Sequence, residues 1–296
     1  MNTLLLNKTN DLLKEISNEE IEYYLMDLAS RFPKNTQNYY LSYSGGRDSH
    51  FLLWFIKEYL KDNKIEIVSI NTYMEHHEIL NRMRKYADRI LIPKTKPFEI
   101  KEKYGSPCFS KTQDEIIDRF QKGTRTKTTL QRIYGTKKSC FNLNKKAKKY
   151  VLYGNAHRIS PKCCTYLKKQ TVKDYEKETG KHAILAVRGS ESFMRRSQYK
   201  SCFSKNGKFH PLYDLTDDML HAIEKKYNIE VPQIYEYVTR TGCAGCPYGS
   251  WKHDTEKELR LVTKNQRKFL GEYFKESYRI LGIDIRKIKE DCGDFN

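Results

Sequence analysis

The sequence lacks any apolar run long enough to form a membrane span. No stretch approaches the roughly 18 to 20 consecutive apolar residues that a bilayer requires. The first residues, Met-Asn-Thr-Leu-Leu-Leu-Asn, also lack the basic start of a secretory signal, and lysines and acids follow at once. We therefore expect a cytoplasmic protein that has no association with membranes.

Cysteine is too infrequent for a disulfide framework, with 8 in 296 residues. At that frequency cysteines more often indicate a metal site, catalysis or buried thiols. The chain also lacks repeats and low-complexity linkers. Its length suffices for one large domain or for a core with a small satellite. We therefore expect one compact unit with helical ends.

Acidic residues are absent from one long stretch in the middle of the chain. From Arg119 through Lys173 there is no Asp or Glu, whereas the same stretch contains 16 Lys and Arg. Because the whole chain has a formal net charge of +18, this block accounts for nearly all of the excess. Concentrated positive charge favours a surface that contacts a polyanion such as DNA or tRNA. A lysine-rich face exposed only to solvent is the alternative.

Apolar strands alternate with segments of helical length, which predicts an α/β fold. Strands are expected at Tyr39–Tyr43, Lys64–Ile70, Arg89–Ile92 and Ala183–Val187. Helices are expected at 3–33, 51–60, 75–86 and 111–120, and a helix or a helix pair is expected at 254–280. A capping box is expected at 17–20, and Thr216 is expected as the N-cap of a further helix. Such units form a parallel sheet, and ligands bind at the carboxyl ends of its strands. Residues 120–150 have no convincing strand, and we interpret them as an insertion over that edge.

A glycine-rich turn joins the first strand to the helix after it. Its sequence is Ser44-Gly-Gly-Arg-Asp-Ser49. Glycines allow close approach of the backbone, while the unpaired N–H groups and the dipole of the following helix favour an anion. The turn lacks the Gly-Lys-Ser/Thr ending of a Walker A loop. We predict an anion-binding loop of another kind; a plain turn is the alternative.

Two cysteine pairs form the second distinctive pattern, Cys163-Cys164 and Cys243-Ala-Gly-Cys246. A Cys-x-x-Cys turn brings two thiolates onto one zinc or iron–sulfur centre. Adjacent cysteines are unusual zinc ligands, because neighbouring side chains diverge. An iron–sulfur cluster, a zinc site and inert reduced thiols all remain open, and Cys202, between the pairs, could replace one ligand.

A third pattern follows the last expected strand, where Arg188-Gly-Ser-Glu191-Ser192 continues to Arg195 and Arg196. Arginines at the carboxyl end of a strand can present forked donors to an oxyanion. The surface of an ordinary helix is the alternative for Arg195 and Arg196.

Together these segments resemble the phosphoadenosine phosphosulfate (PAPS) reductase family of the PP-loop, adenine nucleotide α-hydrolase-like superfamily. The turn at Ser44 resembles the PP-loop, the cysteine pairs resemble the [4Fe–4S] ligands, and the Arg188 segment resembles Gly-x-Arg-x-x-Glu-Ser-x-x-Arg without its first glycine. His210-Pro-Leu-Tyr-Asp-Leu-Thr resembles the family's Pro-Leu-x-Asp-Trp-Thr, with leucine for tryptophan.

This resemblance implies a Rossmann-like parallel sheet flanked by helices. It places a family-like domain at 38–250 with the basic insertion at 120–150, between helical segments at 1–37 and 251–296. The implied metal ligands, for a [4Fe–4S] cluster or alternatively zinc, are Cys163, Cys164, Cys243 and Cys246. The implied nucleotide-binding residues, for ATP or for adenosine phosphosulfate (APS) or PAPS, are Ser42, Ser44, Gly45, Gly46, Arg47, Asp48, Ser49, Asn71, Arg188, Glu191, Ser192 and Arg195. A thioredoxin-type reductant and a homodimer are also consistent with it.

The family's nucleophile is a cysteine near the C-terminus, in Glu-Cys-Gly-Ile/Leu-His. This chain has Asp291-Cys292-Gly293 and lacks the histidine. Cys292 is therefore either the catalytic nucleophile or a chance tail cysteine, because the adjacent acids disfavour its thiolate. Three functions stay open: PAPS/APS reduction, an ATP pyrophosphatase resembling the DndC group that thiolates a nucleic acid, and a binding module without catalysis. His76 and His77, after the second strand, are expected near the substrate.

Overall fold

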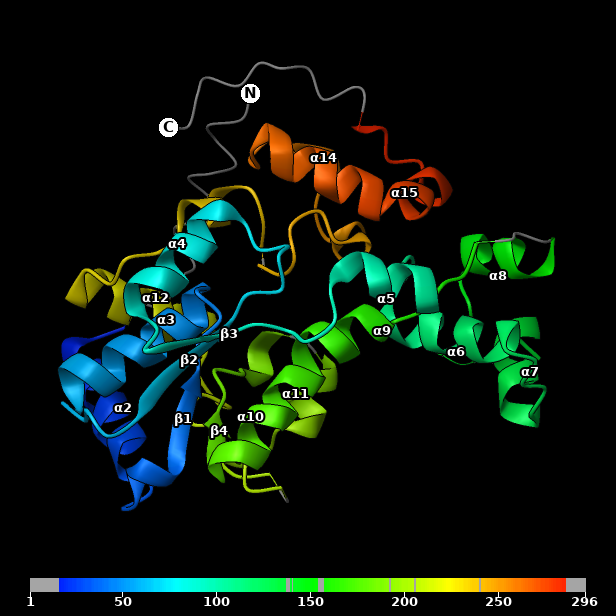
Figure 1. Cartoon of the computed structure of the whole chain (residues 1–296). Coiled ribbons are helices and arrows are strands. Elements are labelled where there is room, and N and C mark those ends of the chain that lie inside the picture. The colour runs from blue at the N-terminus through cyan, green and yellow to red at the C-terminus, as the bar shows by residue number, and fades with distance from the viewer. Residues whose placement is uncertain are drawn as a thin grey trace, which may run out of the picture. The chain divides into compact units, whose positions relative to one another are not determined.

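The computed structural model describes residues 16–136, 139, 141–153, 157–191, 193–204, 206–239 and 241–285 (Figure 1). Its contacts divide the chain into two compact units that alternate along the sequence. Unit 1 comprises Met1–Ser69, Met83–Ile90 and Glu176–Pro232, and unit 2 comprises Ile70–Arg82, Leu91–Tyr175 and Gln233–Asn296. The chain passes between the units inside β2 (Glu66–Ile70), α4 (His77–Tyr86), β3 (Arg89–Leu91) and α10 (Thr171–Thr179), and once directly before the short helix Gln233–Glu236. The expectation of one compact unit with helical ends stays a prediction. The boundaries at 37/38 and 250/251 stay predictions.

The strands and the helices that flank them alternate as the sequence predicts. The strands are β1 (Tyr39–Ser42), β2 (Glu66–Ile70), β3 (Arg89–Leu91) and β4 (His182–Ile184). The helices of the first half are α2 (Asn18–Ser30), α3 (Arg47–Trp54), α4 (His77–Tyr86), α5 (Pro97–Tyr104), α6 (Lys111–Gln121), α7 (Lys127–Tyr134) and α8 (Lys145–Leu152). Those of the second half are α9 (Lys162–Cys164), α10 (Thr171–Thr179), α11 (Phe193–Gln198), α12 (Asp217–Tyr227), α13 (Thr255–Glu258), α14 (Lys264–Tyr273) and α15 (Lys275–Leu281).

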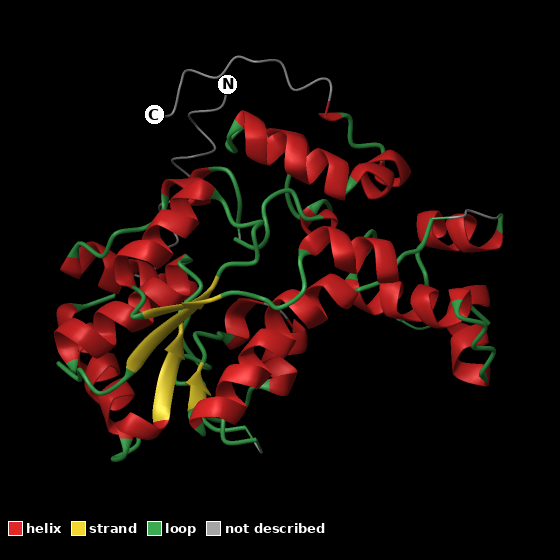
Figure 2. Cartoon of the chain, viewed as in Figure 1, coloured by secondary structure: helices red, strands yellow, loops and turns green. Residues whose placement is uncertain are grey.

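The four strands form one sheet in the order β3-β2-β1-β4 (Figure 2). Strand β1 pairs in parallel with both β2 and β4, with Leu41 opposite Ile67 on one side and Ile184 on the other. The predicted α/β, Rossmann-like fold class is confirmed. Because the order reverses between β1 and β4, the carboxyl ends of these two strands define the position at which such sheets bind ligands.

Unit 1 is held by a core on one face of the sheet. Helix α2 begins at the capping box predicted for Ser17 and Glu20, and it buries Ile21, Leu25 and Leu28 along one stripe. These side chains share a core with apolar residues of β1, β2, α3 and α12. Tyr40 points to the other face of β1, where it is buried and its hydroxyl donates to Glu176 of α10 at 3.1 Å.

Unit 2 contains two cores. The first combines residues of α5, α9 and α14 with the cysteine pairs. The second joins α6, α7 and α8 around Ile117, Ile133 and Ala147. Helices α7 and α8 were not predicted, although each begins at a capping residue, Thr126 and Asn144. In unit 2 and in unit 1 alike, no described helix is long and apolar enough to cross a membrane.

Several element boundaries differ from those expected. The helix expected to start at Phe51 begins at Arg47 and continues as a π-helix over Phe55–Tyr59. Strand β4 ends at Ile184 rather than at Val187, because the chain turns directly after it, with Val187 N donating to Leu185 O at 2.9 Å. The helical stretch expected over 254–280 is divided into α13, α14 and α15.

Candidate functional site

The loop between β1 and α3 has the backbone of an anion-binding turn. Gly45 has a φ of +73°, which an L side chain rarely adopts. Gly46 is the N-cap of α3 and supplies no side-chain cap, so the first amides of the helix are not held by a capping side chain. The Ser44 and Ser49 hydroxyls lie 2.9 Å apart, and Ser49 Oγ also donates to Gly46 O at 3.0 Å. The loop is thus shaped by its own hydroxyls and presents helix amides to a ligand.

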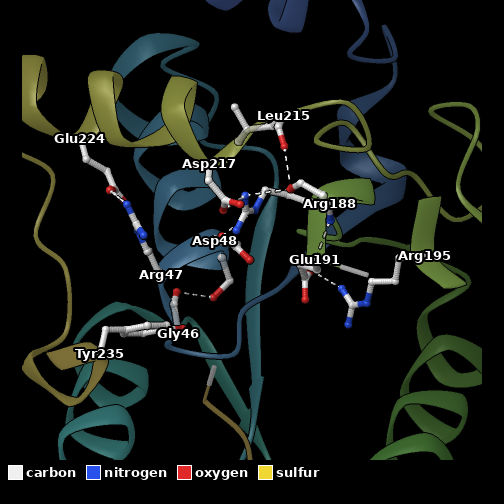
Figure 3. Close-up of polar contacts among 12 residues, drawn as sticks. Gly46, Arg47, Asp48, Arg188, Glu191, Arg195, Leu215, Asp217, Glu224 and Tyr235 are labelled. Atoms are coloured by element: carbon white, nitrogen blue, oxygen red, sulfur yellow. Dashed lines mark hydrogen bonds and ion pairs between the residues drawn. The ribbon is translucent and has the colours of Figure 1, made fainter. Parts of the chain in front are cut away.

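Arg188 reaches this loop from the segment after β4 (Figure 3). Its side chain is 8% exposed and lies between two carboxylates. Nε donates to Asp48 Oδ1 at 2.9 Å, and Nη1 donates to Asp217 Oδ1 at 2.6 Å and to Ser190 Oγ at 3.1 Å. Burial raises the pKa of Asp48, and the guanidinium opposes that rise. The two predicted segments therefore meet at adjacent strand ends, as the sheet order requires.

The other two described arginines of the predicted nucleotide site are held by carboxylates. Arg47 forms a bidentate ion pair with Glu224 of α12, and its Nε lies 2.7 Å from Glu224 Oε1. Arg195 forms an ion pair with Glu191, whose Oε1 also accepts a hydrogen bond from Arg188 N at 3.3 Å. Their contact with a nucleotide stays a prediction. Ser192 lies outside the described residues.

The remaining predicted residues are distributed over the chain. Ser42 is half-buried at the end of β1 in unit 1. Asn71 belongs to unit 2, where its Oδ1 accepts a hydrogen bond from Tyr73 N at 2.9 Å. Cys202 is half-buried and packs against the core of unit 1. Cys292 lies outside the described residues, so its role stays a prediction.

Both cysteine pairs lie in unit 2. Cys163 and Cys164 are in α9, with their sulfurs 3.9 Å apart. Cys243 contacts Thr72, whose Oγ1 is 3.7 Å from its sulfur, and a short 3₁₀ turn, Pro247–Gly249, follows Cys246. Within 16–285, apart from the gaps, no group of three or more His, Cys, Asp or Glu side chains is arranged to hold a metal ion. The thiols are thus gathered in one region without ligand geometry.

The electrostatics of the cysteines show that the two pairs lie close to each other. The pKa of Cys163 is raised well above its usual value by its hydrogen bond with Cys164, by burial and by the nearby Cys246 and Cys243. That same hydrogen bond lowers the pKa of Cys164, and burial opposes the effect. Cys243 is the main cause of a raised pKa for Lys168, with further contributions from other thiols and an opposing effect of burial.

Lys168 is a residue that the sequence analysis missed. It lies in the π-helix Thr165–Gln170, directly after the adjacent cysteines. Helical segments that widen to π geometry occur frequently at functional sites. The spacing of four residues from Cys164 places the two side chains on one helical face, and that spacing was a usable signal. Its ammonium stabilises negative charge on the neighbouring thiols.

Asp114 supports the turn after Cys246. Its side chain is fully buried and accepts hydrogen bonds from Cys108 N at 2.7 Å, Phe109 N at 3.0 Å and the Tyr248 hydroxyl at 2.8 Å. Burial raises the pKa of this carboxyl to about 6, although the backbone donors lower it. No local pattern links Asp114 to a tyrosine more than a hundred residues later.

A buried carboxylate lies between two histidines in the same unit. Glu258 Oε1 is 2.8 Å from His76 Nε2, and Glu258 Oε2 is 2.9 Å from His253 Nε2. Burial alone would raise the pKa of Glu258, but the hydrogen bonds from His253 and His76 bring it down to about 2. The predicted place of His76 near a substrate stays untested. In the structure His76 contacts Glu258 of α13. The His253 ring, which contacts the same carboxylate, lies against Gly249 in the turn after Cys246.

No protein-family model matches the sequence, and none of the curated proteins matches it. Solved structures similar to this chain include the PAPS reductase of Candida auris, in a phosphate complex, at 15% identity and a TM-score of 0.40, covering 82% of this chain and 96% of that one. The U34-tRNA thiolase NcsA of Methanococcus maripaludis, with its [4Fe–4S] cluster, has 12% identity and a TM-score of 0.39, covering 93% and 83%. The NH3-dependent NAD synthetase of Campylobacter jejuni has 16% identity and a TM-score of 0.35, covering 90% and 96%.

At these identities and TM-scores the likeness carries no argument about the reaction, the cofactor or the partners of this chain. Its own residues carry that argument.

Proposed function

We propose that this chain is an adenine-nucleotide-binding enzyme of the PP-loop type. The observation that carries the proposal is the meeting of the Ser44–Ser49 loop with Arg188 at adjacent strand ends. The loop offers the N-terminal end of α3, which no side chain caps, together with the Ser44 and Ser49 hydroxyls, and Arg188 offers a buried guanidinium 2.9 Å from Asp48. Phosphate groups are the ligands that such donors bind in proteins.

The reaction we propose is reduction of APS or PAPS. The thiolate of Cys292 would attack the sulfur of the sulfonucleotide, forming an S–S bond to give an S-sulfocysteine, while the sulfur–oxygen bond to the nucleotide breaks. AMP or its 3′-phosphorylated form leaves with the electron pair. A thioredoxin-type dithiol would then release sulfite and become a disulfide. The loop and Arg188 would hold the nucleotide so that its sulfur faces the thiolate.

The thiols of Cys163, Cys164, Cys243 and Cys246 would hold a [4Fe–4S] cluster. Four sulfur donors, two from α9 and two from the turn at Cys243–Cys246, fit the ligand set of such a cluster, and they fit zinc as the alternative. When bound, the cluster supplies a charged, polarisable group that alters the electric field near the substrate. Lys168 would balance the negative charge of the ligating thiolates, which fits its raised pKa.

Sulfite release from APS and from PAPS, with a thioredoxin-type reductant, tests the reaction. We expect the wild-type chain and Cys202→Ser to release sulfite and Cys292→Ser to release none. Equal release by wild type and Cys292→Ser would exclude Cys292 as the nucleophile. No release from either nucleotide would overturn the reduction but leave nucleotide binding to be measured separately.

A second candidate is ATP-dependent thiolation of a nucleic acid. It is favoured by the exposed lysines of α7 and α8, which reduction of a small sulfonucleotide does not require. In this reaction ATP would adenylate the acceptor and release pyrophosphate. Pyrophosphate release that depends on added RNA or DNA, without sulfite release from APS or PAPS, would favour this candidate over the first.

A further inference from the structure

Helices α6, α7 and α8 form a small helical subdomain within unit 2 and are labelled in Figure 1. It is built on its own apolar core, which includes Ile117, Ile133, Leu143 and Ala147. Each of these side chains faces inward, so the opposite faces of α7 and α8 are left to solvent. The composition of those outer faces is therefore not explained by packing.

The end of α7 and the start of α8 are tied together at this surface. Leu143 N donates to Arg132 O at 3.0 Å, and Lys148 Nζ donates to Tyr134 O at 2.7 Å. The Arg132 guanidinium lies over the Phe141 ring, 5.3 Å from its centroid. An arginine, a lysine and two aromatic rings thus share one neighbourhood.

Positive charge surrounds this neighbourhood without acids of its own. Lys127 on α7 and Lys145, Lys146 and Lys149 on α8 are exposed. The nearest acids along the chain, Glu115 and Asp118 of α6, are paired with Arg119 and Lys122. The charge of α7 and α8 is therefore not neutralised within either helix.

Aromatic side chains are exposed at the end of α7, in the connection to α8 and directly after α8. Tyr134 is 47% exposed, Phe141 is 39% exposed and Tyr153 is 80% exposed. An exposed ring between cations costs solvation and is not required by the core. Flat rings beside lysines and arginines provide the two contacts that unpaired nucleotides need, stacking for the base and an ion pair for the phosphate.

We propose that this surface, formed by Lys127, Arg132, Tyr134, Phe141, Lys145, Lys149 and Tyr153, binds a single-stranded segment of nucleic acid. The lysines contact phosphates and the rings stack on bases. The bases of a duplex are paired and stacked on one another, so a duplex would contact only the lysines and arginine of this surface. An anionic lipid surface would also attract the positive charges, so competition by lipid vesicles distinguishes it from a single strand. The proposal goes beyond nucleotide binding by the Ser44 loop and does not depend on it.

Fluorescence anisotropy with labelled 15-nucleotide single strands of RNA and of DNA, without ATP or sulfonucleotide, tests the charge contribution. We expect affinity to fall steeply with salt. The double variant Lys145→Gln/Lys149→Gln should reduce the slope of log affinity against log salt by about 1.4, because each phosphate contact on a single strand contributes about 0.7. The matched control Lys64→Gln/Lys225→Gln removes two exposed lysines of unit 1 and should leave the slope unchanged. Equal slopes for both double variants would overturn the proposal.

The aromatic contribution is tested by Tyr134→Ala, with Tyr23→Ala as the control. Tyr23 is 78% exposed on α2 of unit 1, so Tyr23→Ala removes an exposed tyrosine ring from outside the proposed surface. We expect Tyr134→Ala to bind single strands roughly tenfold more weakly and a duplex as tightly as before. If Tyr134→Ala binds single strands like wild type, or if vesicles of phosphatidylglycerol compete as well as the strand does, the surface is not a single-strand site. Loss of nucleotide binding by the Ser44 loop would leave all of these results unchanged.

Discussion

The Arg188 guanidinium joins two elements far apart in the sequence, through a 2.9 Å hydrogen bond from its Nε to Oδ1 of Asp48 at the start of α3. A second carboxylate, Asp217 at the start of α12, accepts from Nη1. Arg188 is thus satisfied by acids in the absence of a ligand. A phosphate group that binds here competes with the more exposed of the two, Asp217, whose side chain is 65% exposed.

This competition predicts that Asp217→Asn strengthens nucleotide binding. Removing the carboxylate frees one face of the guanidinium and removes a negative charge next to the phosphates. Because the Asp217 side chain is largely exposed and screened by water, we expect a gain of only about threefold in affinity. The neighbouring Asp218→Asn removes an equal charge from the same helix and should have no comparable effect. Titration calorimetry with ATP and with APS measures both, and a weaker affinity for Asp217→Asn would contradict the account of Arg188.

Anaerobic purification followed by iron and sulfide analysis tests the thiol cluster. We expect about four irons and four sulfides per chain, as a [4Fe–4S] cluster requires. Cys164→Ser and Cys243→Ser should lose them, whereas Cys202→Ser should keep them. A colourless protein with one zinc per chain would establish the alternative metal, and loss of iron in Cys202→Ser would make that residue a ligand.

Glu258→Gln should destabilise unit 2. The substitution replaces a buried carboxylate that bonds two imidazoles with a neutral amide, and charge-assisted hydrogen bonds of this kind contribute about 2 kcal/mol to the free energy of unfolding. The pKa of Glu258 is lowered to about 2, so the effect should be complete above pH 5 and should shrink as the pH falls toward 2. Urea unfolding at several pH values measures it. Glu236→Gln, at an exposed position, is the control. An equal loss of unfolding free energy in both variants would contradict a stabilising role for the hydrogen bonds of Glu258.

Asp114 should make stability fall as the pH rises. Its folded pKa of about 6 lies above the usual value of 3.8, because burial disfavours the charged form. The folded chain therefore keeps this proton to a higher pH than the unfolded chain, and ionisation between about pH 4 and 6 costs the folded state.

Between pH 5 and pH 7.5 the wild type should lose about 1 kcal/mol more unfolding free energy than Asp114→Asn does. The comparison removes the contribution of histidines, which both proteins share. Parallel stability curves for the two proteins over this range would show that the carboxyl does not titrate as proposed.

The strands and the glycine-rich loop could be predicted because their signals are local. Tyr39–Ser42 and Glu66–Ile70 are short apolar runs, and the turn at Ser44 lies directly between a strand and a helix. The capping box at Ser17 and the N-cap at Thr216 are likewise contained within four residues. Short local patterns were therefore enough to predict the strands and helix starts that position the Ser44–Ser49 loop.

The partners of the site could not be predicted, because each lies far away along the chain. Nothing near Arg47 indicates Glu224, and nothing near Tyr248 indicates Asp114. Helices α7 and α8 were missed for a different reason: their lysines dominated the composition and hid the spacing of Ile133, Leu143 and Ala147, which form the core of that subdomain.

The most direct test of the central claim is calorimetric titration of the wild-type chain with ATP, APS and PAPS, beside Ser44→Ala and Arg188→Gln. Ser44 is exposed, so its variant should fold normally, and melting temperatures of both variants check this. The account predicts one adenine nucleotide bound per chain and an affinity at least tenfold lower in each variant. Failure of all three nucleotides to bind the wild type, or unchanged affinity in both folded variants, would contradict it.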